Sequence, residues 1–270
     1  MGIFDGYLLA SDFDGTLTGS DGNIRENNID AIKYFIREGG FFTISTGRTR
    51  EGFHKYSETI INAPVLLGNG AMAYDYKTEK IAFTNAIGVE NIDALNRMIA
   101  EHPYLGTELY TADGRVFVIN KNEANLRHFD ALKLASFSDA EKFSEDMFPI
   151  VKVMVSAGER AKKLQEYFDR TDMCSMKYIP TRGSFVEILS ASSGKGNALH
   201  QLADYLGVEK SKAFCIGDGS NDTDMLEAAE TSFCPSSGEE LARNAAKVIV
   251  CSSDEGCVAD AIGYIEKNLT

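Results

Sequence analysis

The sequence lacks any long hydrophobic run. No apolar stretch in its 270 residues reaches the length of about eighteen that a membrane-spanning helix requires. The N-terminus turns acidic after only a few apolar residues, which does not match the hydrophobic region of a secretory signal. We therefore expect a cytoplasmic protein that does not associate with membranes.

Paired cysteines and clustered positive charge are also missing. The five cysteines form no C-x-x-C pair and have no histidine partner nearby, so we expect neither a disulfide framework nor a zinc site. The formal net charge is −13, and Lys and Arg do not cluster. Because nucleic-acid backbones are bound by clustered Lys and Arg, this composition argues against a nucleic-acid partner.

The first part of the chain alternates between strand and helix patterns. A short apolar run over 7–11 predicts a buried strand. Apolar residues at helical spacing follow from Ile24, and a Gly-Gly pair predicts the end of that helix. Runs over 41–45 and 64–67 predict two more strands. This alternation predicts an α/β domain with a parallel sheet.

A different pattern follows the third predicted strand. Two strand-like runs around a polar turn predict a hairpin over 72–84, after which helical and strand-like segments mix. We predict an inserted α+β domain over 84–188. From Gly196 the alternation of helix and strand resumes. The first domain is therefore expected to be discontinuous and to comprise 1–83 and 189–270.

Two aspartates follow the first predicted strand. In the run DFDGT, Asp12 and Asp14 stand two residues apart, and a glycine lets the chain turn. Asp-Gly pairs are common in ordinary turns, so the run alone is a weak signal. A calcium-binding EF-hand loop also begins with Asp-x-Asp, but it needs a glycine and an acid where this chain has Leu17 and Asn23.

A second acidic run, GDGSND, lies between a predicted strand and the start of a helix. The N–H groups at a helix N-terminus attract phosphate. Asp218 and Asp222 add the hard oxygen ligands that Mg²⁺ prefers. Capping of the following helix is an alternative role for Asp222, and it accounts for one carboxylate rather than two.

Two further fragments complete the pattern. The run STGR ends another predicted strand and offers a hydroxyl, N–H groups and a guanidinium. Lys195 starts a helix but is not in a P-loop, since Leu189 and Gly196 stand where that motif needs Gly and Ser or Thr. All four fragments fall where a strand ends or a helix begins, and open α/β sheets bind ligands at this edge.

Together, DFDGT, STGR, GKGNAL and GDGSND resemble, in order and spacing, the motifs of the haloacid dehalogenase (HAD) superfamily of phosphohydrolases. The match is to its Cof-type sugar-phosphatase branch. The resemblance implies a Rossmann-like parallel-sheet core with an α+β cap of type C2B, because the extra residues lie between Thr46 and Lys195. It also implies a Mg²⁺-dependent phosphatase that acts on a small phosphorylated metabolite through an aspartyl-phosphate.

Carried over to this chain, the resemblance makes Asp12 the nucleophile and Asp14 the general acid and base. Thr46 and Lys195 would hold the transferring phosphoryl group. The implied metal ligands are Asp12, Asp14 through its backbone carbonyl, and Asp218, with Asp222 supporting both the metal and Lys195. The implied substrate-binding residues are Gly15, Thr46, Gly47, Arg48, Lys195 and Asn221.

Two other functions stay open at this point. A phosphomutase of the phosphomannomutase type would return the phosphate to its substrate, and a catalytically idle protein would only bind a metal or a phosphometabolite. The complete set of catalytic side chains argues against the idle protein, and a phosphate-release assay separates the three. Substrate specificity should come from the cap, where Arg182, His128 and Lys152 are candidates. The resemblance also allows Glu187 a role near the substrate.

Overall fold

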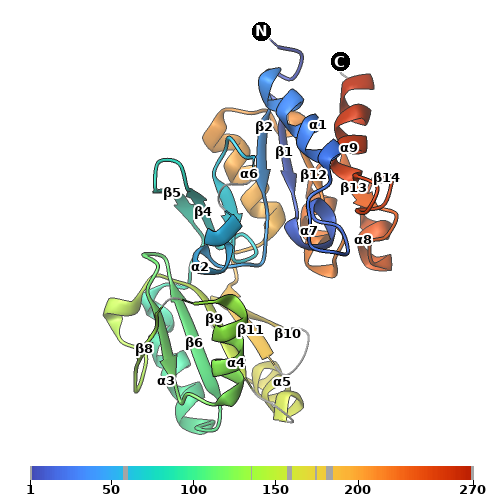
Figure 1. The fold of residues 1–270 in the computed structure, drawn as a ribbon. Helices are drawn as coiled ribbons and strands as arrows, with labels where there is room; N and C mark the ends of the chain where they lie inside the picture. Colours follow the sequence, from blue (N-terminus) through green and yellow to red (C-terminus); the bar gives the residue numbers. More distant parts are fainter. Residues whose placement is uncertain are drawn as a thin grey trace. The chain divides into compact units, whose positions relative to one another are not determined.

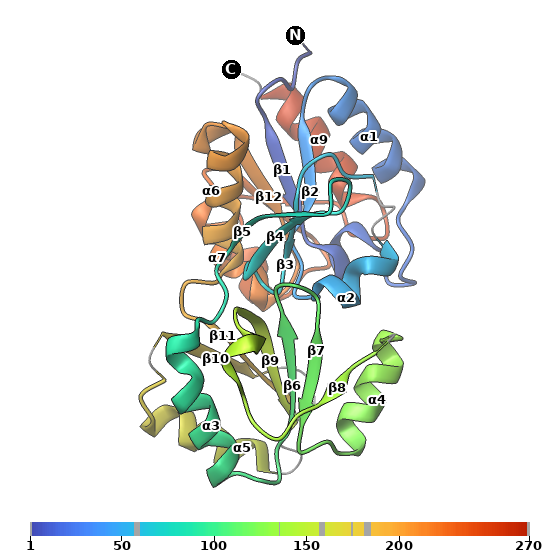
Figure 2. The same cartoon turned by 90° about the vertical axis from the view of Figure 1, so that its left-hand side faces the viewer.

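The computed structural model describes most of the chain (Figures 1 and 2). Its described residues are 2–56, 60–134, 136–156, 160–173, 175–180 and 185–268.

The chain divides into two compact units. The second unit takes in a short segment that begins at Arg48, the last residue of the run STGR. It ends at Ser193, five residues beyond the predicted limit of 188, and its last strand runs on to Ser190. The first unit comprises Met1–Gly47, Tyr56–Phe83 and Gly194–Thr270, and the second comprises Arg48–Lys55 and Thr84–Ser193.

A five-stranded parallel sheet forms the centre of the first unit. Its order is β14-β13-β12-β1-β2, and every pair of neighbours runs parallel. All four residues of β1 are buried, as expected for a parallel strand covered on both faces. The strands are β1 (Leu8–Ser11), β2 (Phe41–Ile44), β12 (Ala213–Ile216), β13 (Ser232–Pro235) and β14 (Val248–Val250).

Helices cover both faces of this sheet (Figures 1 and 2). Helices α1 and α9 pack together on one face, and α6 and α7 lie on the other. Leu199 and Leu202 of α6 join Leu8 and Ala10 of β1 in one apolar core. The helices of this unit are α1 (Glu26–Arg37), α6 (Lys195–Leu206), α7 (Thr223–Ala228), α8 (Glu240–Ala245) and α9 (Cys257–Lys267).

A small three-stranded sheet adjoins the parallel sheet. Its strands β3 (Val65–Leu67), β4 (Met72–Asp75) and β5 (Lys80–Thr84) include the predicted hairpin. The predicted strand at 64–67 forms, but it pairs antiparallel with β4 rather than extending the parallel sheet. A single parallel bridge between Ser45 and Leu66 joins it to the end of β2.

The second unit is an α+β unit around a six-stranded sheet of order β10-β11-β9-β6-β7-β8. Its strand pairs are antiparallel except β7 with β8. Apolar side chains of α3 and α5 pack against one face of the sheet. The elements are α2 (Arg50–Phe53), α3 (Ile92–Glu101), β6 (Gly106–Thr111), β7 (Val116–Ile119), α4 (Glu123–Leu132), β8 (Ser138–Asp139), β9 (Ile150–Ser156), α5 (Ala161–Arg170), β10 (Met176–Pro180) and β11 (Phe185–Ser190).

The opposite face of this sheet carries both polar side chains and a smaller apolar cluster, in which Tyr110 and Val118 pack with Phe129 of α4. Glu108 and Tyr110 of β6 lie there, and Lys152 of β9 is the register partner of Tyr110. Among the described residues, no helix is long and apolar enough to cross a bilayer.

Candidate active site

The loops after β1 and β12 begin side by side at the carboxyl edge of the parallel sheet. Asp12 follows β1 directly, and its N–H donates to the carbonyl oxygen of Ile216, the last residue of β12, at 2.8 Å. The chain then continues from Ile216 to Asp218 and Asp222. Because the two strands are adjacent and parallel, the aspartates that follow them meet at this edge.

Gly15 allows the two loops to approach each other closely. The helical turn Phe13–Leu17 places Gly15 at φ +87°, which glycine adopts far more readily than other residues. A Cβ atom at this position would lie 2.6 Å from Oδ2 of Asp218. Thr16 joins the loops from the same turn, since its Oγ1 donates to Oδ1 of Asp218 at 2.6 Å. Both the backbone conformation and the lack of a side chain are therefore required at residue 15.

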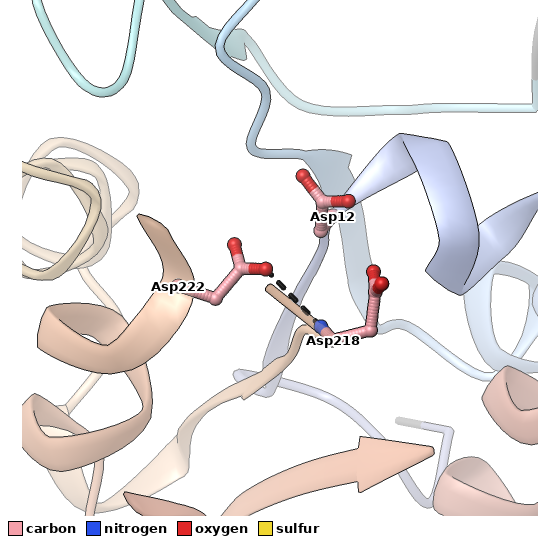
Figure 3. A group of neighbouring side chains, drawn as sticks. All are labelled: Asp12, Asp218 and Asp222. Atoms are coloured by element: carbon pink, nitrogen blue, oxygen red, sulfur yellow. Dashed lines mark hydrogen bonds between the residues drawn. The ribbon is translucent and has the colours of Figure 1, made fainter. Parts of the chain in front are cut away.

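Three carboxylates gather at the site (Figure 3). Asp12, Asp218 and Asp222 each offer an oxygen, and these oxygens lie within 4.8 Å of one another. Asp12 and Asp222 are buried, and Asp218 is partly buried. A set of carboxylate oxygens is what Mg²⁺ binds in proteins, so these residues fit a divalent cation. The exposed side chain of Asp14 is not part of this group.

Lys195 lies among these carboxylates. It is the first residue of α6 and is 1% exposed, and its Nζ donates to Oδ1 of Asp12 at 2.6 Å and to Oδ1 of Asp222 at 2.5 Å. Asp222 also accepts the N–H groups of Asp218 and Gly219 through Oδ2, at 3.1 and 2.9 Å. Asp222 therefore closes its own loop and orients Lys195 at the same time (Figure 3 shows the first of these loop bonds).

The electrostatics of the site favour an added cation. Burial raises the pKa of Asp12 to about 8, and the nearby Asp222 and Asp218 add to this while Lys195 opposes it. Burial opposes the charge of Lys195, but Asp12 and Asp222 outweigh it and raise its pKa. Burial also raises the pKa of Asp218. One lysine does not balance three close carboxylates, and a divalent cation would.

The loop after β2 starts at the same edge. The N–H of Ser45 donates to the carbonyl oxygen of Ser11 at 2.8 Å, and Thr46 is buried directly after it. A Cβ atom at Gly47 would lie 3.0 Å from Oδ1 of Asn69, and the same oxygen accepts from Nδ2 of Asn221 at 3.4 Å. Asn69 therefore contacts two residues predicted to bind substrate.

The sequence prediction did not include Asn69. The available signal was the run Gly-Asn-Gly directly after a predicted strand. That run reads as ordinary turn chemistry, and we used it only as a boundary between domains.

Several predicted residues belong to the second unit. Arg48 is one of them, and its Nη1 donates to the carbonyl oxygen of Gly52 at 3.5 Å. Lys152 and Glu187 form a buried ion pair at 2.8 Å. Nδ1 of His128 lies 2.7 Å from Oε2 of Glu108, which is fully buried. Arg182, the remaining specificity candidate, lies outside the described residues.

The fold class agrees with that of solved HAD phosphatases. The structure of the HAD subclass IIB sugar phosphatase BT4131 matches with a TM-score of 0.79 at 17% sequence identity, covering 96% of this chain and 98% of that one. At this identity the match establishes a shared fold. The predicted Rossmann-like core with an inserted α+β domain is confirmed.

Sequence comparison then gives the family. The model of the haloacid dehalogenase-like hydrolases matches residues 9–262, and the chain belongs to this family. A putative phosphatase of Haemophilus influenzae is 27% identical over 252 residues, covering 92% of this chain and 94% of its own. The 5-amino-6-(5-phospho-D-ribitylamino)uracil phosphatase YwtE of Bacillus subtilis is 27% identical over 275 residues, covering 93% and 95%. The predicted class of phosphoric monoester hydrolase, of Cof type, is confirmed.

Proposed function

We propose that the protein is a Mg²⁺-dependent phosphatase that hydrolyses small phosphomonoesters, sugar phosphates among them, through an aspartyl-phosphate on Asp12. One observation carries this proposal. Three carboxylates lie within 4.8 Å at the carboxyl edge of the parallel sheet, and the buried Lys195 bonds to two of them. This arrangement combines a carboxylate nucleophile, ligands for a cation and a positive group for phosphate.

The metal ligands would be Asp12, Asp218 and the backbone carbonyl of Asp14, with Asp222 supporting both the ion and Lys195. When bound, Mg²⁺ supplies positive charge that offsets the repulsion between an anionic nucleophile and the phosphate. The raised pKa of Asp12 supports this assignment, because burial and the neighbouring carboxylates disfavour its ionised form and a bound cation would favour it.

The first displacement transfers the phosphoryl group to the protein. A carboxylate oxygen of Asp12 attacks phosphorus, and an O–P bond to Asp12 forms as the ester O–P bond breaks. Asp14 gives its proton to the departing oxygen. Lys195 and the loop at Thr46 hold the non-bridging oxygens. The exposed side chain of Asp14 is able to exchange this proton with solvent.

The second displacement releases phosphate. The carboxylate of Asp14 takes a proton from water, and the water oxygen attacks the phosphorus of the aspartyl-phosphate. The O–P bond to Asp12 breaks, which yields inorganic phosphate and restores both aspartates. In a phosphomutase a substrate hydroxyl would take the place of water, so release of phosphate distinguishes the two reactions.

We further propose that the first unit is the catalytic core and that the second is a cap that limits substrate size. The buried Lys152 and Glu187, together with His128, are the side chains that we assign to the leaving group. Small substrates are supported by the relatives, since BT4131 is described as a sugar phosphatase and YwtE as acting on a phosphorylated ribitylaminouracil. A cytoplasmic location stays a prediction of the sequence.

The test is a screen of the purified protein with Mg²⁺ against phosphorylated sugars, nucleotides and cofactors, with inorganic phosphate as the readout. We expect release from small phosphomonoesters, its loss in EDTA and its recovery on return of Mg²⁺. The Asp12→Asn protein is the control for contaminating phosphatases. Absence of phosphate release from the whole panel, or a rate that EDTA leaves unchanged, would refute the proposal.

A further inference from the structure

The loop that follows β3 has an uncommon backbone. Gly68, Asn69 and Gly70 are three consecutive residues with left-handed φ values of 59°, 54° and 84°. Glycine adopts these values freely, whereas a side chain there costs about 1 kcal/mol or more. Asparagine is among the few other residues that tolerate this conformation. An asparagine between two glycines at such a position indicates that its side chain makes contacts that a glycine could not make.

The backbone of this 68–70 loop is bonded to the loop after β2. The N–H of Asn69 donates to the carbonyl oxygen of Thr46 at 3.0 Å, and the N–H of Thr46 donates to the carbonyl oxygen of Leu66 at 2.8 Å. Asn69 itself is only 9% exposed. These bonds hold the side chain of Asn69 next to the peptide that joins Thr46 to Gly47.

The side-chain amide of Asn69 contacts two other loops, at Asn221 and at Gly47. Its Oδ1 accepts from Nδ2 of Asn221 at 3.4 Å. Its Oδ1 and Nδ2 would lie 3.0 and 3.3 Å from a Cβ atom at Gly47. Asn221 is an exposed residue of the turn Ser220–Asp222, where a side-chain amide without such a contact would sample several rotamers.

The same loop also packs on the segment that carries Lys195. A Cβ atom at Gly70 would lie 2.2 Å from the carbonyl oxygen of Gly194, the residue before Lys195. The 68–70 loop therefore contacts the segments that bear Thr46, Lys195 and Asn221. These are three of the groups to which the proposed function assigns the phosphoryl oxygens.

We infer that Asn69 is a positioning residue, whose amide fixes the side chain of Asn221 and the peptide after Thr46 in the arrangement that receives a phosphoryl group. The inference rests on the proposed function for the identity of the bound anion. Fixing these groups before binding reduces the conformational entropy lost when phosphate binds. Asn69 itself does not touch the reacting atoms in this scheme.

The test uses Asn69→Gly, which removes the amide and keeps the left-handed backbone accessible. The probe is inorganic phosphate in the presence of Mg²⁺, titrated by calorimetry, alongside kcat and KM for a hexose phosphate. We expect the Kd of phosphate and KM to rise about tenfold, corresponding to 1.4 kcal/mol, with a melting temperature within a few degrees of the wild type.

The chain offers a matched control in Asn120. It is an exposed asparagine in the second unit with φ 51°, so Asn120→Gly makes the same chemical change on the same kind of backbone. It should leave the Kd of phosphate unchanged. A double-mutant cycle of Asn69→Gly with Asn221→Ala should give a combined loss smaller than the product of the single losses, because both variants remove the same contact.

A lower melting temperature of Asn69→Gly with an unchanged Kd of phosphate would overturn the inference, because the residue would then only stabilise the fold. If Asn69→Gly does not fold, Asn69→Ala, which also removes the amide, takes its place in the cycle, and strictly multiplicative effects of Asn69→Ala and Asn221→Ala would overturn it equally. Failure of the proposed function has a different signature. The wild type would then bind phosphate but release none from any phosphomonoester, and the comparison of Kd values would still decide the role of Asn69.

Discussion

Replacing Asp12 by Asn should stabilise the metal-free protein while it abolishes turnover. In the fold, burial and two neighbouring carboxylates raise the pKa of Asp12 from 3.8 to about 8. A carboxyl whose pKa is raised by folding contributes most stability below its unfolded pKa, and that contribution is lost as the pH rises from about 4 towards 8. At pH 7 the loss is about 4 kcal/mol, from roughly three pKa units at 1.4 kcal/mol each.

An uncharged amide avoids this loss. Relaxation around the new side chain and a weaker bond to Lys195 will reduce the gain, so we expect about 1 to 3 kcal/mol. For a chain of this size, that corresponds to a melting temperature about 3 to 10 °C higher.

The assay is thermal unfolding of both proteins in EDTA, at pH 7 and again at pH 4.5. The difference should be largest at pH 7 and should shrink at pH 4.5, because the Asp12 carboxyl of the unfolded wild type is then partly protonated and folding has to take up less of a proton. Added Mg²⁺ should then raise the melting temperature of the wild type more than that of Asp12→Asn, because the variant has lost a ligand. Asp14→Asn is the matched control, since its side chain is exposed and makes the same change in charge two residues away.

The reasoning would be refuted if Asp12→Asn melted at or below the wild-type temperature in EDTA at pH 7. Such a result would mean that burying the Asp12 carboxyl beside Asp218 and Asp222 does not destabilise the metal-free fold. An equal gain in Asp14→Asn would also refute it, because the effect would belong to net charge rather than to the buried cluster.

Three further outcomes are expected. Asp14→Asn should keep Mg²⁺ and phosphate binding but lose about 10² to 10⁴ in kcat, since it removes the proton donor; a near-normal kcat would contradict this role. Gly15→Ala should raise the Mg²⁺ concentration needed for half-maximal rate, because its Cβ would lie 2.6 Å from Oδ2 of Asp218; an unchanged Mg²⁺ dependence would speak against the ligand assignment. A hexose phosphate should give a much higher kcat/KM than a folded protein that carries phosphoserine, and comparable values would show that the second unit does not limit substrate size.

The parallel sheet was largely predictable because its strands are buried on both faces and read as short apolar runs. Strands β1, β2 and β12 are of this kind. Strand β13, with the sequence SFCP, was missed because Ser and Pro resemble turn residues, and its burial comes from its neighbours in the sheet. The pairing of β3 was also not readable, since it depends on a hairpin that folds back against it.

The gathering of Asp12, Asp218 and Asp222 could be anticipated, because each follows a strand of one parallel sheet at the same edge. Contacts that depend on how far a side chain reaches could not. Asn69 contacts a residue 152 positions away, and Glu108 takes its partners Asn125 and His128 from a helix 17 and 20 residues later. No local periodicity marks such pairs, because the contact depends on the fold that brings them together.

The places where the chain passes from one unit to the other have a mechanical consequence. Gly47 and Arg48 form one of these passages, and Ser193 and Gly194 form another. Thr46 is the residue directly before the first passage, and Lys195 is the residue directly after the other. A rotation about the backbone at either passage therefore acts one residue away from a group that we propose to bind the phosphoryl oxygens, without a relay of packed side chains. The two residues proposed to hold the phosphoryl oxygens therefore lie next to the points where the chain enters and leaves the second unit.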